Sequence, residues 1–421
     1  MELVFAEATP PGRGGVSVVR ISGAGARQAA ERLAGPLPRA RHAYFRVLTC
    51  EGEELDRALV MWFEAGSSFT GEEVAELHLH GAPVIVRRLT RALLDRGLRQ
   101  AEAGEFTRRA FLNGRLDLAE VEGLGDLLEA ETEAQRRLAL RAAGGELSRK
   151  ADEWRALLIR AGALVEASVD FADEDIPDEV PSEVFDLLAQ LRADLDRQLD
   201  GFPAAERLRS GFEVAIIGAP NAGKSSLINR IARREVALVS EIAGTTRDVI
   251  ELRIDLNGIA VTLLDTAGLR DTSDHVEGLG VSRARQRARA ADIRVHVSPS
   301  GDLDGELWSD GDLVVRSKSD LADGGTGLPV SSMTGEGVSE LLAALDAALR
   351  ARTAGAGLFS HERQVRALDD ARRALTGVGG QPPELIAEAI RQVSASLDRL
   401  LGRIGAEDYL DVIFAQFCVG K

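Results

Sequence analysis

The sequence predicts a multidomain chain with an α+β domain, a helical domain, and an α/β domain inserted into the helical one. The 421 residues exceed the usual size of a single domain. Short apolar alternations mixed with helical stretches give way to a purely helical period after residue 118. Strands and helices then alternate, which is typical of a parallel sheet with crossover helices. The predicted domains are 1–118, 119–207 plus 353–421, and 208–352.

The composition places the chain among soluble globular proteins. Hydrophobic residues make up 45%, and no apolar run approaches the roughly 18 residues of a membrane span. The N-terminus lacks the basic-then-apolar pattern of a signal peptide. Two cysteines, Cys50 and Cys418, are too few for a disulfide framework. We therefore expect a cytoplasmic protein with no membrane partner.

The charge distribution is uneven. A net charge of −16 argues against a general nucleic-acid binder. Residues 119–207 hold 10 basic and 22 acidic residues, a net of −12, whereas residues 1–118 hold 16 against 15. Arginine has replaced lysine nearly everywhere, and the four lysines are Lys150, Lys224, Lys318 and Lys421. This distribution does not exclude a local contact between phosphate and residues outside the acidic segment 119–207.

The third domain begins with a phosphate-binding signature. An apolar run over 212–217 leads into Gly218-x-x-x-x-Gly223-Lys224-Ser225. The glycines allow backbone N–H groups to turn inward, Lys224 supplies a point charge for the β- and γ-phosphates, and the Ser225 hydroxyl is a Mg²⁺ ligand. This strand, loop and helix start predict a Ras-like P-loop domain.

Further motifs follow in the order expected of a GTPase. Asp265 ends a strand and would hold Mg²⁺ through water, and Thr246 is the expected second protein ligand of Mg²⁺. The Asp320 carboxylate can accept two hydrogen bonds from guanine, which adenine cannot donate, so GTP is favoured over ATP. The predicted GTP contacts are Asn221, Ala222, Gly223, Lys224, Ser225, Ser226, Ser240, Glu241, Ile242, Ala243, Gly244, Thr245, Thr246, Asp265, Thr266, Ala267, Gly268, Ser317, Lys318, Ser319, Asp320, Ser331, Ser332 and Met333.

The third domain departs from the usual GTPase pattern at several positions. Ser317 stands where Asn is usual, and Ser332 and Met333 replace the common Ala-Lys or Ala-Arg, so we predict weakened guanine affinity. Leu269 follows the Asp-x-x-Gly motif where many GTPases place a water-orienting Gln. Another group must therefore orient the water and offset the transition-state charge. The strand 293–297 also carries Arg294 and His296, unusual for a central strand.

The full set of motifs resembles the MnmE (TrmE) family, the GTPase of tRNA wobble-uridine modification, over nearly the whole chain. The matching stretches are 8–15, 20–23, 68–72, 104–107, 109–113, 116–118, 218–229, 244–248, 265–270 and 417–421. The resemblance implies a K⁺ ion in place of an arginine finger, at positions matching Asn221, Ser240, Ile242 and Thr245. It also implies G-domain dimerisation across the nucleotide face. Glu277 matches the acidic residue that positions water indirectly, so the implied catalytic residues are Glu277, Lys224 and Thr246; a solvated loop acid is the alternative for Glu277.

The resemblance also implies a folate-binding N-terminal domain that forms a constitutive homodimer. The donor would be a tetrahydrofolate derivative, 5-formyl- or 5,10-methylene-tetrahydrofolate. The matching contacts are Arg20, Glu76, Arg115 and Lys421, with Glu suited to the N–H edge of a pterin and Arg or Lys to glutamyl carboxylates. Glu76 could instead be a solvated surface acid. Cys418 is a further functional candidate by the resemblance, and a buried structural thiol fits its sequence equally well.

By the same resemblance, the partners are tRNA and MnmG, an FAD-dependent protein. Together they would install an aminomethyl or carboxymethylaminomethyl group at C5 of the wobble uridine. Two alternatives stay open on the residues alone. One is a regulatory ribosome-assembly GTPase without one-carbon chemistry, and the other is a folate-dependent transferase with a regulatory nucleotide domain.

Overall fold

The computed structural model describes residues 2–170, 180–234, 238, 251–265, 285–321, 324–404, 410, 413–415, 417 and 420. Its contacts divide the chain into two compact units. Unit 1 is Met1–Gly125 with Ser394–Lys421, and unit 2 is Asp126–Val393. Among the described residues, no helix combines the length and apolar character needed to cross a bilayer.

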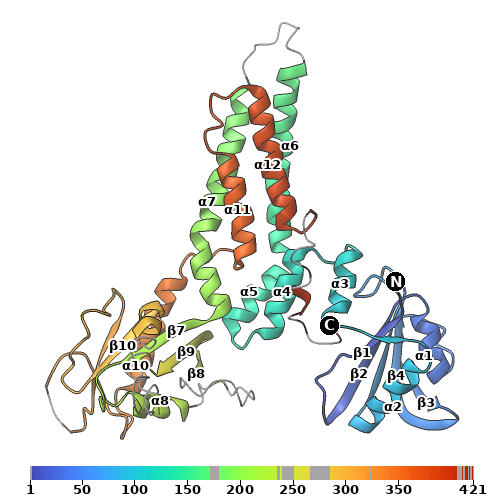
Figure 1. Ribbon diagram of the computed structural model, residues 1–421, viewed down its shortest axis with the longest axis horizontal. Helices are drawn as coiled ribbons and strands as arrows, with labels where there is room; N and C mark the ends of the chain where they lie inside the picture. Colours follow the sequence, from blue (N-terminus) through green and yellow to red (C-terminus); the bar gives the residue numbers. More distant parts are fainter. Residues whose placement is uncertain are drawn as a thin grey trace, which may run out of the picture. The chain divides into compact units, whose positions relative to one another are not determined.

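Unit 1 is built on a six-stranded sheet of order β3-β4-β5-β2-β1-β6 (Figure 1). Its pairs are antiparallel except for β1 with β6. The strands are β1 Val4–Glu7, β2 Gly14–Ser22, β3 Tyr44–Cys50, β4 Glu53–Phe63, β5 Val74–Gly81 and β6 Arg99–Gln100. Leu77 and Leu79 of β5 join the core with α1 (Ala26–Ala34) and α2 (Pro83–Leu94). Because side chains alternate along a strand, Glu76 and His78 lie on the opposite face.

The end of the chain also packs into unit 1. Helices α3 (Glu105–Leu112) and α4 (Leu118–Glu129) follow the sheet, and Leu118 forms an apolar cluster with Phe414 and Phe417. Gly420 has φ +99°, and a Cβ there would lie 2.2 Å from the Glu7 carbonyl oxygen. Only glycine fits this close approach at a left-handed φ.

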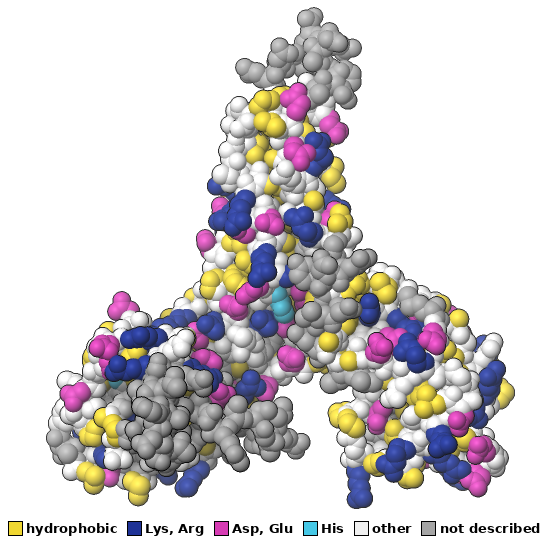
Figure 2. Space-filling model, in the orientation of Figure 1, with side chains coloured by type: hydrophobic (Ala, Val, Ile, Leu, Met, Phe, Trp, Pro, Cys, Tyr) yellow, Lys and Arg dark blue, Asp and Glu magenta, His cyan; other side chains and the backbone are white. Residues whose placement is uncertain are grey.

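Unit 2 contains long helices and a second sheet. The helices are α5 Glu133–Ala143, α6 Glu146–Asp170, α7 Ser182–Ser210 and α11 Glu362–Ala374, with α12 Pro383–Leu400 crossing into unit 1. Helices α6, α7 and α11 run side by side (Figure 1), and Trp154 of α6 stacks on Phe359 with ring centroids 5.9 Å apart. Basic and acidic side chains are intermixed over this part (Figure 2), as in the pair Arg366–Glu362.

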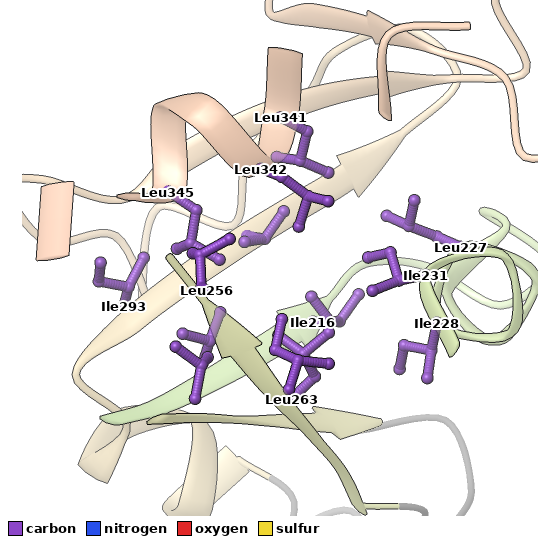
Figure 3. Packing of buried hydrophobic residues seen from close by; sticks show 14 of the residues in the cluster. Ile216, Leu227, Ile228, Ile231, Leu256, Leu263, Ile293, Leu341, Leu342 and Leu345 are labelled. Atoms are coloured by element: carbon purple, nitrogen blue, oxygen red, sulfur yellow. The ribbon is translucent and has the colours of Figure 1, made fainter. Parts of the chain in front are cut away.

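The second sheet lies between α7 and α11 in the sequence, as expected of an inserted domain. Its order is β12-β11-β10-β7-β9-β8, parallel except for the β8–β9 pair. The elements are β7 Phe212–Ile217, α8 Lys224–Ala232, β8 Glu251–Leu256, β9 Ile259–Asp265, β10 Ile293–Ser298, β11 Leu313–Ser317, β12 Leu328–Val330 and α10 Val338–Thr353. Strand residues such as Ile216 and Leu263 pack with Ile228 of α8 and Leu341 of α10 in one core (Figure 3). The predicted combination of α+β, helical and α/β P-loop architecture is confirmed.

Arg294 and His296 of β10 both have hydrogen-bond partners in the segment that precedes β11. Arg294 Nε donates to Asp312 Oδ2 at 2.8 Å, and the Arg294 backbone N–H donates to Oδ1 at 2.9 Å. His296 Nδ1 accepts from the Asp304 backbone N–H at 3.1 Å. Burial lowers the pKa of His296, although Asp312 opposes the shift. A buried charge is tolerable when paired and hydrogen-bonded in this way.

Candidate functional site

The phosphate loop connects β7 to α8 in unit 2. Gly218 has φ +152°, and a Cβ there would lie 2.1 Å from the Val297 carbonyl oxygen of β10. Asn221 also has a positive φ, of 61°, and Gly223 has φ +102°. The loop therefore needs glycine at its start and turns sharply before the first turn of α8. Backbone N–H groups at a helix N-terminus favour a bound anion.

One predicted ligand of Mg²⁺, Ser225, meets Asp265, which is predicted to hold the ion through water, beside this loop. The Ser225 hydroxyl donates to Asp265 Oδ2 at 2.6 Å, although the residues lie 40 positions apart. Hydroxyl and carboxylate oxygens are the donors that Mg²⁺ prefers. The Lys224 ammonium is buried and donates to the Gly218 and Ala219 carbonyl oxygens at 2.8 Å each. The residues present thus fit a phosphate group with its magnesium ion.

The predicted base end is tied directly to the phosphate loop. The buried Ser317 hydroxyl donates to the Ala222 carbonyl oxygen at 2.6 Å. Lys318 follows with φ +55°, which turns the chain at the end of β11. Ser317 therefore joins the two halves of the candidate nucleotide site with a single hydroxyl.

The 331–335 loop has an anchor that sequence reasoning missed. Ser331 is buried, and its hydroxyl accepts from the Thr334 backbone N–H at 3.1 Å. Arg230 of α8 donates to the Thr334 carbonyl oxygen at 2.8 Å. Met333 is 82% exposed. Spacing on α8 could not have indicated Arg230, because its acceptor lies 104 residues away.

Several predicted site residues lie outside the described residues. They are Ser240, Glu241, Ile242, Ala243, Gly244, Thr245, Thr246, Thr266, Ala267, Gly268, Glu277, Cys418 and Lys421.

A second candidate site lies in unit 1, where Arg20 of β2 faces Glu76 of β5. Arg20 Nε donates to Glu76 Oε1 at 3.0 Å, and Nη2 lies 2.9 Å from the same oxygen. His78 Nε2 lies 3.3 Å from Glu76 Oε2. The hydrogen bond with His78 lowers the pKa of Glu76, burial opposes this, and Arg20 adds to the lowering. Glu76 is therefore ionised, and Arg20 and His78 hold its carboxylate in place.

Two aromatic rings lie near the Arg20 guanidinium. The Arg20 guanidinium lies 5.9 Å from the Phe69 ring centroid and 5.7 Å from that of Phe106. Phe106 is buried, whereas Phe69 is 38% exposed. The exposed Arg115 lies at the same loop, because a Cβ on Gly71 would lie 3.1 Å from its Cγ. Arg20 and Arg115 therefore each lie beside loop 66–72, and Arg20 binds Glu76.

A buried ion-pair network supports that loop. Arg109 donates to Glu72 and to Glu105 at 2.8 Å each, and the Ser22 hydroxyl also donates to Glu72, at 2.8 Å. Burial opposes ionisation of Glu105, yet hydrogen bonds from Arg99, the Glu102 backbone and Arg109 outweigh it and lower its pKa to about 2. Glu72, Glu105 and Arg109 belong to the sequence stretches 68–72, 104–107 and 109–113. These contacts give the three stretches a structural role beside loop 66–72.

Comparisons with known proteins agree over the whole chain. The family model described as the MnmE helical domain matches residues 118–418, and that of the GTP-binding protein TrmE N-terminus matches residues 3–115. The tRNA modification GTPase MnmE of Paracoccus denitrificans is 61% identical over 421 residues, covering 100% of both chains. The chain belongs to the MnmE family of tRNA modification GTPases. The MnmE of Cereibacter sphaeroides (strain ATCC 17029) is 55% identical over 429 residues, again covering 100% of both.

Solved structures add little beyond this. The G domain of the T. maritima FeoB iron transporter aligns over 32% of this chain and 98% of its own, with 23% identity and a TM-score of 0.25. As a member of the MnmE family, the chain is a GTPase of tRNA modification, which implies a nucleotide and Mg²⁺. The predicted membership of the MnmE (TrmE) family and the predicted GTPase class are confirmed. The ribosome-assembly alternative loses its support.

Proposed function

We propose that this chain hydrolyses GTP to time the addition of a (carboxymethyl)aminomethyl group at C5 of the wobble uridine, with a tetrahydrofolate derivative as one-carbon donor. The observation that carries this proposal is that Arg20, which binds Glu76, and Arg115 both lie beside loop 66–72 of unit 1. Gly420, the residue before Lys421, packs against Glu7, whose neighbour Ala6 pairs with Arg20. This packing supports a role for Lys421 in the same site.

In the nucleotide site, a water molecule attacks the γ-phosphorus, and the bond to the β,γ-bridging oxygen breaks to give GDP and phosphate. Lys224 offsets charge on the phosphates, and Ser225, Thr246 and Asp265 would hold the magnesium ion. When bound, the magnesium and potassium ions would supply positive charge beside the phosphates, which is the role of an arginine finger in other GTPases. We assign potassium to Asn221, Ser240, Ile242 and Thr245, and indirect positioning of water to Glu277.

We further propose that the chain forms a homodimer through its N-terminal domain and works with MnmG and tRNA. Dimerisation of the nucleotide domains across their nucleotide face would activate hydrolysis. The segment 119–207, with its net charge of −12, is unsuited to binding tRNA backbone strongly. MnmG would therefore supply much of the positive surface that contacts the tRNA.

The test is complementation of a strain that lacks this gene. Wobble-uridine modification is measured by mass spectrometry of tRNA hydrolysates after restoring the wild-type chain, Glu76→Gln or Ser225→Ala. We expect the wild type to restore the modified nucleoside and both variants to fail. Full modification by Glu76→Gln would remove the folate role, and unmodified tRNA with the wild type would remove the proposal as a whole.

A further inference from the structure

Helix α2 of unit 1 is a basic helix on an otherwise nearly neutral part of the chain. It carries three arginines, Arg87, Arg88 and Arg91, and no acidic residue. Leu89 and Leu93 of the same helix pack into the core of unit 1. Because an α-helix has 3.6 residues per turn, the arginines lie on the side of α2 that faces away from this core.

Two of the arginines form part of one exposed stripe along α2. Val84, Arg87, Arg91 and Leu94 follow one another at helical spacing, and all four side chains are exposed. Figure 2 shows several basic side chains over this end of unit 1. With a rise of 1.5 Å per residue, Arg87 and Arg91 start about 6 Å apart along the helix axis. The outer face of α2 therefore presents two cations side by side.

These two cations have no carboxylate partner. Among the described residues, the side chains of Arg87 and Arg91 form no ion pair and no hydrogen bond. Asp95 lies one turn beyond Arg91, and no ion pair joins the two side chains within the described part of the chain. Arg88 differs, because it pairs with Glu53. An anion can therefore bind Arg87 and Arg91 without displacing an acidic side chain.

Exposed arginines on other helices of the chain are mostly bound within one helical turn. Arg136 pairs with Glu133 at 2.7 Å, and Arg366 pairs with Glu362 at 2.8 Å. Such i,i+3 and i,i+4 pairs are the usual surface arrangement of an arginine beside an acid. The absence of acids from α2 leaves its arginines outside this arrangement, and a phosphate group is the anion that a guanidinium binds best, through two parallel hydrogen bonds.

We propose that the outer face of α2 binds the phosphate backbone of the tRNA, with Arg87 and Arg91 each contacting a phosphate. This inference rests on the proposed function, in which the chain acts on tRNA together with MnmG, and it assigns the place where this chain contacts the RNA. The segment 119–207, with its net charge of −12, repels a polyanion, whereas α2 lies in residues 1–118, with 16 basic and 15 acidic residues. Backbone contacts of this kind position the RNA and carry no sequence information.

The test titrates fluorescently labelled tRNA with the complex of the full chain and MnmG, at several salt concentrations between about 50 and 200 mM. Each phosphate contact adds about 0.7–0.9 to the slope of log association constant against log salt concentration. Arg87→Ala and Arg91→Ala should each reduce the slope by that amount and weaken binding about five- to eightfold at about 0.1 M salt. The double variant should lose about twice the slope of either single variant. Alanine preserves the helix, since its helix propensity is at least that of arginine.

Two control variants separate the contact from general effects of charge and folding. Val84→Ala changes the same stripe without changing its charge, and Arg366→Ala removes one positive charge from α11; both should keep the wild-type slope and bind within about twofold of wild type. GTP binding checks that each variant is folded. The inference is overturned if the double variant keeps the wild-type slope, or if Arg366→Ala loses as much slope as Arg87→Ala. It is also overturned if the double variant weakens assembly with MnmG in the absence of tRNA, because α2 would then contact protein. A wild-type complex that binds no tRNA refutes the proposed function itself.

Discussion

Removing the Ser317 hydroxyl is the most direct test of how the nucleotide site is assembled. Ser317→Ala deletes the 2.6 Å hydrogen bond to the Ala222 carbonyl oxygen and leaves that carbonyl group without this donor. A buried neutral hydrogen bond contributes about 1–1.5 kcal/mol. If the phosphate loop then populates other conformations, the dissociation constant rises by the inverse of the competent fraction. We expect GDP and GTP to bind about tenfold more weakly.

The assay is a titration with a fluorescent guanine nucleotide, and Thr326→Val is the matched control. The Thr326 hydroxyl also donates to a backbone carbonyl oxygen of this domain, that of Gly301 at 3.0 Å, but Thr326 is not among the predicted GTP contacts. Its loss should change affinity less than twofold. Ser317→Asn keeps a donor and should bind at least as tightly as wild type. Equal affinities for Ser317→Ala and wild type, or an equal loss in Thr326→Val, would refute this role of Ser317.

Four other predictions follow from the contacts. Asp312→Asn leaves the buried Arg294 without its carboxylate and should lower the free energy of unfolding of unit 2 by about 3–5 kcal/mol, measured by denaturant titration. Because the pKa of Glu105 falls from 4.5 to about 2 on folding, its roughly 3 kcal/mol of stabilisation is full above pH 4.5 and is lost as the pH falls through 2; the stability gap between wild type and Glu105→Gln should close over that range, and a constant gap would contradict this. Gly420→Ala should displace the chain terminus from Glu7 and weaken folate binding while sparing GTP binding, both by titration. Replacing potassium by sodium should reduce GTP turnover at least tenfold and prevent dimerisation of the nucleotide domains with a transition-state mimic; turnover indifferent to the ion would count against the assignment of Asn221.

The nucleotide site was predictable wherever its chemistry is encoded by local spacing. Gly218, Lys224 and Ser225 lie within one loop, and their roles follow from the strand before them and the helix after them. The hydrogen bond from the Ser317 hydroxyl was not predictable, because its acceptor, the Ala222 carbonyl oxygen, lies 95 residues away. The sequence suggested only that the loss of the usual Asn weakens this end. That weakened guanine affinity stays a prediction, and tight, guanine-selective binding would contradict it.

In unit 1 the sequence supplied the residues but not their arrangement. Arg20 and Glu76 were predicted by resemblance, with Arg20 assigned to the glutamyl tail. Their pairing across β2 and β5 depends on strand register, which motif spacing does not encode. His78 was missed, although its place two residues after Glu76 put it on the same face of any strand there. The predicted boundaries of the three domains stay a prediction.

The choice between arginine and lysine follows the geometry of each contact. Arg109 contacts two carboxylates at once, and Arg294 contacts Asp312 together with the carbonyl oxygens of Ala288, Arg289 and Ala291. An ammonium, with three donors, can also contact two carboxylates, as Lys150 does with Glu153 and Asp194. The four acceptors around Arg294 instead suit a planar guanidinium with five donors. Lys224 lies in a loop so tight that Gly218 admits no Cβ, and a compact point charge suits that space. In a chain with four lysines, the ammonium at 224 suits this loop, where it donates to the Gly218 and Ala219 carbonyl oxygens.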